Sequence, residues 1–125
     1  MIKNDLVVLA VDDDLINLKL LKSMLLKLPN VKEIIEAKNG SDGVEILKSR
    51  DDVDLILLDI IMPVMSGIEV LKVVRADKNL RQLPIIVLTT DETKKSEALE
   101  FGANGFLTKP IRSEELKSKI SSVMV

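Results

Sequence analysis

The sequence contains no cysteine and no histidine among its 125 residues. Without cysteine, the chain can form neither a disulfide framework nor a thiolate nucleophile or thiolate metal site. Without histidine, it lacks the commonest general base near neutral pH and the commonest ligand for transition metals. Any chemistry that this chain performs must therefore depend on carboxylates, hydroxyl groups and amines.

Long apolar runs and basic blocks are also missing. No run approaches the roughly 18 apolar residues of a membrane span, and the apolar stretch at the N-terminus is too short for a secretory signal. The net charge is −2, and the basic residues form no long block that would indicate a nucleic-acid surface. The sequence therefore predicts a cytoplasmic protein that binds neither a membrane nor nucleic acid.

The chain instead contains apolar segments that alternate with segments of helical periodicity. Because 46% of the residues are hydrophobic and the length is that of one core, we expect a single domain over residues 1–125. The strongest apolar runs are nearly continuous, as in strands buried on both faces of a parallel sheet. The expected strands cover 6–11, 31–37, 54–60, 83–89 and 105–108. The expected helices begin after Asp14 and cover 41–50, 67–77, 91–101 and 113–124.

Five strand–helix units in succession predict an α/β fold. The expected architecture is a flavodoxin-like, doubly wound, five-stranded parallel sheet of order 2-1-3-4-5, with five helices in a three-layer arrangement. At the boundaries of the helices, we expect Asp14 and Ser113 to be N-caps. Gly102 should end the fourth helix, because glycine readily adopts the left-handed backbone that follows many helices.

Polar residues gather where the expected strands end. Asp12 and Asp13 follow the first strand, Asp59 ends the third, Thr89 the fourth, and Lys109 follows the fifth. Each taken singly has an ordinary structural explanation, such as a strand end or a solvated surface charge. In parallel sheets of this kind, however, the carboxyl ends of the strands form the binding edge, so the set predicts one site.

The charges at this edge predict a cation. Two carboxylates about 4 Å apart repel by roughly 1 kcal/mol in water and about 4 kcal/mol at an effective dielectric constant of 20. With oxygen ligands alone, a hard ion such as Mg²⁺ is favoured over zinc or copper. Three carboxylates, one Mg²⁺ and the Lys109 ammonium sum to zero charge. This arrangement suits the formation of an aspartyl phosphate.

The same residues lie in motifs that resemble the receiver domain of two-component response regulators. The resemblance covers essentially the whole chain and implies that Asp59 is the phosphoacceptor. It also implies that Mg²⁺ is bound by Asp12, Asp13, Asp59 and the backbone carbonyl of Ile61. The motifs are "VDDD", "LLDIIMPVMSG", "IIVLTT" and "GANGFLTKP".

The resemblance further implies a switch. Thr89 would hydrogen-bond the phosphoryl group, Lys109 would pair with it, and Phe106 would occupy the aromatic switch position. The Lys109–Pro110 peptide bond would be cis. The donor would be a histidine kinase or a histidine phosphotransfer protein, since this chain has no histidine. A downstream protein would bind the surface formed by residues 91–124. The chain would not be a turnover enzyme.

Several alternatives remain open at this stage. A flavodoxin-like nucleotide binder would need a Gly/Ser/Thr-rich phosphate loop where this chain has three aspartates. A haloacid-dehalogenase-type phosphatase would need a second aspartate two residues after Asp59, where this chain has Ile61. A receiver that acts without phosphorylation is disfavoured by the intact set of residues.

The chain could be a stand-alone receiver or a piece of a larger regulator, and its start at Met1 favours a complete or N-terminal piece. Thr90, where the resembled family has a smaller residue, is expected to narrow access to the phosphoryl group.

Overall fold

The five apolar segments form the five strands of one parallel sheet. The structure is a computed structural model that describes residues 4–124. The strands lie in the order β2-β1-β3-β4-β5, and all four pairings are parallel, so the predicted topology is confirmed. The strands are β1 (Leu6–Val11), β2 (Val31–Ala37), β3 (Leu55–Asp59), β4 (Ile85–Thr89) and β5 (Gly105–Thr108).

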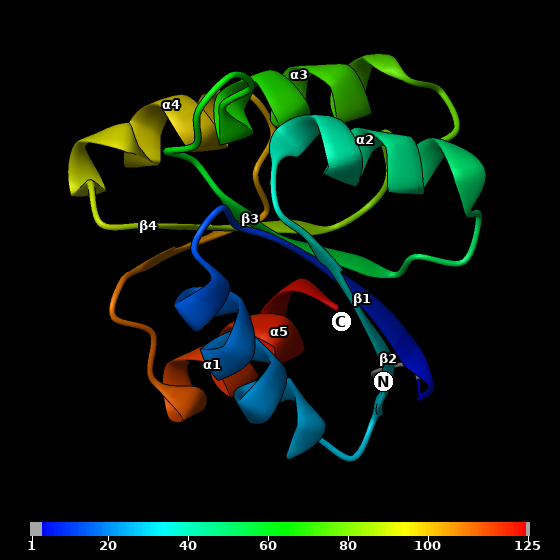
Figure 1. Ribbon diagram of the computed structural model, residues 1–125, viewed down its shortest axis with the longest axis vertical. Coiled ribbons are helices and arrows are strands. Elements are labelled where there is room, and N and C mark those ends of the chain that lie inside the picture. The colour runs from blue at the N-terminus through cyan, green and yellow to red at the C-terminus, as the bar shows by residue number, and fades with distance from the viewer. Residues whose placement is uncertain (1–3, 125) are drawn as a thin grey trace.

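Helices cover both faces of this sheet. Figure 1 shows α2, α3 and α4 on one side of the strands and α1 and α5 on the other. Among the described residues, none of these helices combines the length and the hydropathy needed to cross a bilayer. The helices are α1 (Leu15–Leu26), α2 (Gly40–Ser49), α3 (Gly67–Ala76), the 3₁₀ turn η1 (Glu92–Lys94), α4 (Lys95–Glu100) and α5 (Ser113–Val123).

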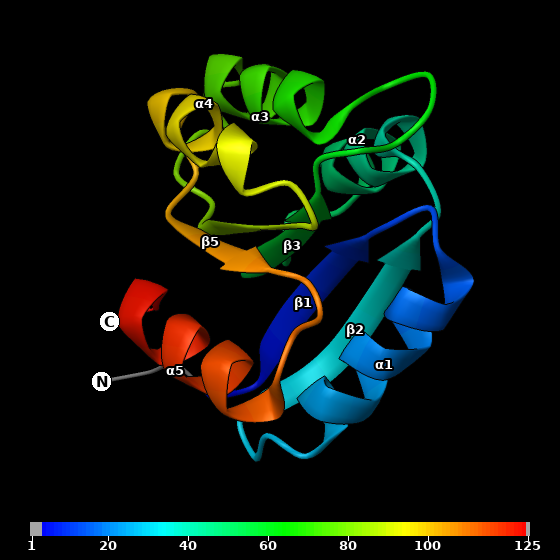
Figure 2. The same ribbon diagram turned by 90° about the vertical axis from the view of Figure 1, so that its left-hand side faces the viewer.

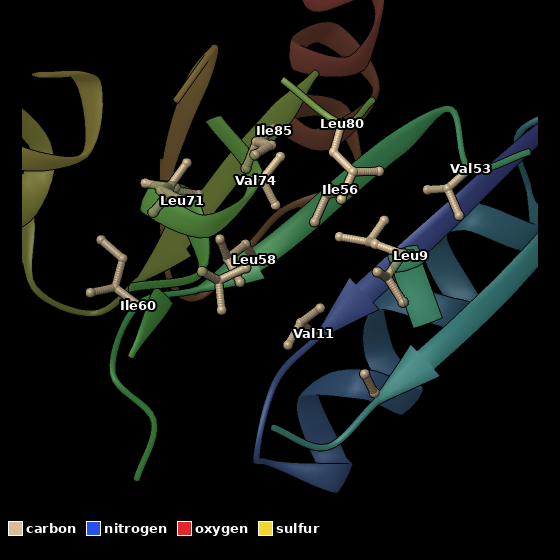
Figure 3. Close-up of a cluster of buried hydrophobic side chains, with 14 of the residues drawn as sticks. Leu9, Val11, Val53, Ile56, Leu58, Ile60, Leu71, Val74, Leu80 and Ile85 are labelled. Carbon is tan, nitrogen blue, oxygen red and sulfur yellow. The ribbon is translucent and has the colours of Figure 1, made fainter. Parts of the chain in front are cut away.

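The core consists of two apolar layers, one on each face of the sheet. Successive side chains of a strand point to opposite faces, so Leu9 and Val11 of β1 pack with α2 and α3, whereas Val8 packs with α1 and α5. Figure 3 shows the first layer, in which Leu71 and Val74 of α3 lie over β3 and β4. Burial on both faces explains why these strands are continuous apolar runs in the sequence.

Two of the three expected helix boundaries are confirmed. Asp14 caps α1, because its carboxylate accepts a hydrogen bond from the backbone N–H of Ile16 at 2.9 Å. Gly102 follows α4 with a φ of 104°. Ser113 is not an N-cap, and that prediction is wrong. The carbonyl of Arg112 accepts the first helical hydrogen bond from Leu116 at 3.0 Å, so α5 begins one residue earlier than a serine cap requires.

Residues 91–101 do not form one continuous helix. The carboxylate of Asp91 accepts a hydrogen bond from the backbone N–H of Thr93 at 2.9 Å and starts a 3₁₀ turn. The α-helix begins only at Lys95, and no side chain caps it. The α-helix α4 therefore follows a capped 3₁₀ turn and has no side-chain cap of its own.

The outer strand β2 is more exposed than the other strands. It carries Lys32, Glu33 and Glu36, of which Lys32 and Glu36 are exposed. The guanidinium of Arg50, just after α2, donates two hydrogen bonds to the Glu33 carboxylate, each 2.9 Å long, and two more to Asp52. This group of charges ties the end of α2 to the edge of the sheet.

Candidate functional site

The carboxyl edge of the sheet brings together acidic and basic side chains from distant parts of the chain. Asp12 directly follows β1 and Asp59 ends β3, and the two residues are only 1% and 5% exposed. Lys109 directly follows β5. Figure 2 shows the segment after β5 crossing in front of the sheet before it enters α5, and Lys109 at the start of this segment contacts Asp12.

Three carboxylates converge at this edge. One oxygen from each of Asp12, Asp13 and Asp59 lies within 4.8 Å of the other two. Asp13 is exposed, so the group opens to solvent on one side. An open set of carboxylate oxygens, with no nitrogen or sulfur donor among them, fits a hard divalent cation such as Mg²⁺.

Lys109 joins two of these carboxylates. Its ammonium nitrogen lies 2.9 Å from Oδ2 of Asp12 and 3.4 Å from Oδ2 of Asp59. Its backbone N–H donates to the carbonyl of Thr89 at 2.8 Å, and the Lys109–Pro110 peptide bond is cis, as expected. The lysine is therefore held in place from β4 while its charge offsets part of the repulsion between the aspartates.

The three consecutive aspartates have different local roles. The backbone N–H of Asp12 donates to Ala37 of β2 at 3.1 Å, and its Oδ1 accepts from the N–H of Asp14 at 2.9 Å. Asp14 caps α1, as described above. Asp13 has neither role and presents its carboxylate toward solvent beside Asp12 and Asp59. The run therefore supplies one helix cap and two members of the acidic group.

Burial makes the charge on Asp59 costly. Loss of hydration is the largest effect, and together with the Asp12 carboxylate it raises the pKa of Asp59 to about 6. The Lys109 ammonium and the backbone N–H of Ile61 act in the opposite direction but do not cancel the effect. A carboxylate in this position gains from any additional positive charge.

Gly67 allows the loop after β3 to fold back over Asp59. Its N–H donates to the carbonyl of Ile60 at 2.8 Å. A Cβ atom at this position would lie 2.3 Å from the carbonyl oxygen of Asp59, so any side chain would push the loop away. Gly67 is not among the predicted site residues, although its place eight residues after Asp59 and before an apolar helix was a usable signal.

The same loop contains a strained and exposed residue. Val64 has a φ of 69° and is 98% exposed. The left-handed region is unfavourable for a β-branched side chain. Ile61 is 53% exposed, and its apolar side chain offers no ligand atom, so only its backbone carbonyl is a candidate cation ligand.

Thr89 and Phe106 lie on the neighbouring strands β4 and β5, and Thr89 ends β4 at the carboxyl edge of the sheet. Thr89 is fully buried, and its hydroxyl oxygen accepts a hydrogen bond from the backbone N–H of Asp91 at 3.2 Å. Phe106 is half-buried and pairs in register with Val87 of β4. The Thr108 hydroxyl donates to Glu92 at 3.3 Å and so connects β5 to the β4–α4 loop. Thr90 is exposed at the same edge.

The chain is similar in sequence to known signalling proteins. The sequence model of the response regulator receiver domain matches residues 8–121. A chemotaxis protein CheY homolog from Campylobacter jejuni is 34% identical over 93% of this chain and 90% of its own length. The two-component response regulator ORR7 from rice is 32% identical over 94% of this chain, which covers 56% of that protein.

Solved structures show the same likeness. The chemotaxis response regulator CheY4 of Vibrio cholerae superposes with a TM-score of 0.87 at 32% identity, over 96% of this chain and 99% of that one. The CheX–CheY–BeF3–Mg complex from Borrelia burgdorferi gives a TM-score of 0.89 at 26% identity, over 98% of this chain and 91% of that one.

Proposed function

The chain belongs to the response regulator receiver family and is a phosphorylatable receiver of two-component signalling, and we propose that Asp59 accepts the phosphoryl group. The observation that supports this most directly is the position of its carboxylate. Asp59 is buried at the end of β3, 3.4 Å from the Lys109 ammonium and within 4.8 Å of Asp12 and Asp13. No other carboxylate of the acidic group ends a strand of the sheet.

In the transfer step, an oxygen of the Asp59 carboxylate attacks the phosphorus of a phosphohistidine on a partner kinase or phosphotransfer protein. The new O–P bond forms as the P–N bond breaks, and the donor's imidazole nitrogen keeps the electron pair. Lys109 moves its charge from the Asp59 carboxylate toward the phosphoryl oxygens. Positioning and charge compensation are the main contributions that a protein makes to this kind of transfer.

Asp12, Asp13, Asp59 and the backbone carbonyl of Ile61 would hold Mg²⁺ in this site. When bound, the ion supplies two positive charges that stabilise the carboxylates and the oxygens of the transferred group. Asp13 is the exposed member, so its carboxylate lies where a cation enters from solvent. Asp12 is fixed because its backbone N–H donates to Ala37 and its Oδ1 accepts from the N–H of Asp14, and its Oδ2 pairs with Lys109.

Phosphorylation of Asp59 then acts through Thr89. The hydroxyl of Thr89 accepts a hydrogen bond from Asp91, and its own proton can be donated to a phosphoryl oxygen on the adjacent strand. Such a bond draws Thr89 inward, loosens the β4–α4 loop and allows Phe106 to change its packing. The α4–β5–α5 surface then changes its preference for a downstream protein.

We propose that the whole chain, residues 1–125, is one receiver domain that acts in the cytoplasm. Receiver domains are signalling proteins rather than turnover enzymes, and we propose that this chain catalyses only its own phosphorylation and dephosphorylation. A phosphatase of the haloacid dehalogenase type would need an acid two residues after Asp59. That position is Ile61, whose side chain is apolar and exposed.

The test is phosphorylation by acetyl phosphate with Mg²⁺, followed by intact-mass measurement. Wild type should gain one phosphoryl group, and Asp59→Asn should gain none. Asp14→Asn is the matched control: it removes a nearby carboxylate that caps α1 and should be phosphorylated like wild type. Failure of wild type to gain the group, or equal gain by Asp59→Asn, would contradict the assignment. Repeated hydrolysis of a generic phosphate ester would instead indicate an enzyme.

A further inference from the structure

Arg75, near the C-terminal end of α3, lies at the opposite edge of the sheet from the acidic group. A guanidinium has five N–H donors, and the five hydrogen bonds of Arg75 are 2.7–3.0 Å long. The acceptors are the carbonyls of Gly102, Arg81 and Leu83 and the side-chain oxygen of Asn104. We call this group the Arg75 cluster. Every acceptor in it is uncharged.

The Arg75 cluster joins two strands at their amino ends. The side-chain oxygen of Asn104 also accepts a hydrogen bond from the N–H of Ile85 at 2.9 Å, and the N–H of Asn104 donates to the carbonyl of Ile85 at 2.8 Å. Ile85 is the first residue of β4, and Asn104 directly precedes β5. These two bonds set the register in which Thr89 lies beside Thr108 at the other end of the pair.

The Arg75 cluster also holds the C-terminal end of α4. Gly102, with its φ of 104°, accepts two bonds from Arg75, and a Cβ there would lie 2.8 Å from Nε of Arg75. A second contact between the same helices is the Lys72 ammonium, 4.5 Å from the centre of the Phe101 ring. Figures 1 and 2 both show α3 and α4 side by side.

The two ends of α4 are therefore held very differently. At its C-terminal end, one side chain from α3 uses all of its donors on the turn that follows the helix and on the nearby loop. At its N-terminal end, α4 has no side-chain cap of its own. The 3₁₀ turn before it is capped by Asp91 within the same loop, and a 3.3 Å bond between Thr108 and Glu92 joins this turn to β5. A movement of Thr89 is passed along the chain to the N-terminal end of α4, which is the less constrained end of this helix.

We propose that Arg75 is a positioning residue for the switch. It keeps the C-terminal end of α4 and the amino ends of β4 and β5 in place, so that phosphorylation displaces the N-terminal end of α4. Without this anchor, β5 and α4 would shift together with Thr89, and the surface around α4 would change little relative to β5. This inference rests on the proposed phosphorylation of Asp59.

The absence of cysteine makes a test straightforward, because one introduced cysteine can be labelled uniquely. Ser96→Cys places an environment-sensitive fluorophore on the exposed N-terminal part of α4, and Ser23→Cys places a reference label on α1. Each protein is phosphorylated with acetyl phosphate and Mg²⁺, and the fluorescence change is divided by the phosphorylated fraction from intact mass. In wild type, the Ser96 label should respond much more strongly than the Ser23 label.

Arg75→Met should still be phosphorylated, but its Ser96 response per phosphorylated molecule should fall about fivefold or more, as expected when a typical coupling is lost. Arg81→Met is the matched control, because the exposed Arg81 contributes only its backbone carbonyl to the cluster, and it should respond like wild type. If Arg75→Met does not fold, variants of Asn104, which accepts a hydrogen bond from Arg75, test the same inference. Asn104→Leu should lose the response, and Asn104→Asp, which keeps the acceptor oxygen, should retain it.

A merely structural Arg75 would give variants that melt earlier but respond like wild type per phosphorylated molecule, and this result would overturn the inference. A silent Ser96 label in phosphorylated wild type would also overturn it, while leaving the proposed function intact. If wild type gains no phosphoryl group, both the inference about Arg75 and the proposed phosphorylation of Asp59 are contradicted.

Discussion

The two ends of the β4–β5 strand pair are built on opposite principles. At the carboxyl end, Asp12, Asp59 and Lys109 bury charges that only partly compensate one another. At the amino end, Arg75 satisfies all of its donors with uncharged oxygens. Buried charge that lacks full compensation responds to ligands, whereas a saturated set of hydrogen bonds resists change. The carboxyl end of the pair is therefore suited to respond to ligands, and the amino end is suited to keep β4, β5 and α4 in place.

The largest effect on stability should come from the saturated end. Arg75→Met leaves several backbone carbonyls without their donor, and we expect the free energy of unfolding to fall by about 2 kcal/mol, since part of the lost bonding is replaced by water. Urea unfolding of this variant beside Arg81→Met measures the difference. Equal midpoints for the two variants would contradict the comparison.

An effect of similar size is a pH dependence at the charged end. Because burial raises the pKa of Asp59 from 3.8 to about 6, the folded protein binds this proton more tightly than the unfolded chain does. The contribution of Asp59 to stability is therefore full below about pH 3.8 and is lost as the pH rises through about 6. Unfolding of metal-free wild type and Asp59→Asn between pH 4 and 7 should show a steeper decline in wild type. Parallel curves would contradict the expected cost of the Asp59 charge.

A smaller effect should follow from adding a cation. If Mg²⁺ binds the acidic group, tenfold excess over the dissociation constant should stabilise the folded protein by about 1.4 kcal/mol. Thermal melts with and without Mg²⁺ measure this gain, and Asp13→Ala should abolish it. Asp14→Asn keeps the acidic group and should keep the gain. An unchanged melting curve in wild type would count against the cation site.

The smallest effect should come from the strained loop at the same edge. Val64 has a φ of 69° but is 98% exposed, so replacing it relieves strain and removes little packing. Val64→Asn should raise the free energy of unfolding by about 1 kcal/mol, since asparagine tolerates the left-handed region better. Chemical denaturation measures the change. A destabilised Val64→Asn would show that the valine side chain makes contacts that outweigh the strain.

Much of the carboxyl edge could be predicted from sequence, because the order of strands in a parallel sheet decides which strand ends lie next to one another. Once the strand order was inferred, Asp12, Asp59 and Lys109 had to lie near one another, whatever the details of the loops. The distances among them were not predictable, nor was the contact of Lys109 with Asp12 in addition to Asp59. Those depend on the path of the segment after β5.

The amino edge was not predicted at all. In the sequence, Arg75 is one basic residue in the last turn of an amphipathic helix, which usually means a solvated charge. Four of its five hydrogen bonds go to backbone carbonyls of the α3–β4 loop and the α4–β5 turn, and backbone carbonyls leave no signature in the sequence. The break in the segment 91–101 was missed for a similar reason, since the 3₁₀ turn depends on a local hydrogen bond that the Asp91 carboxylate accepts from the backbone N–H of Thr93.

The charges on β2 bear on how the protein behaves at high concentration. An outer strand offers unpaired backbone groups to other chains, and edge-to-edge pairing of this kind leads to aggregation. A strand added beyond β2 would bring its side chains against Lys32, Glu33 and Glu36, and would have to accommodate the guanidinium of Arg50 already bound to Glu33. Charge on both faces of β2 thus discourages the sheet from growing into a neighbouring molecule at this edge.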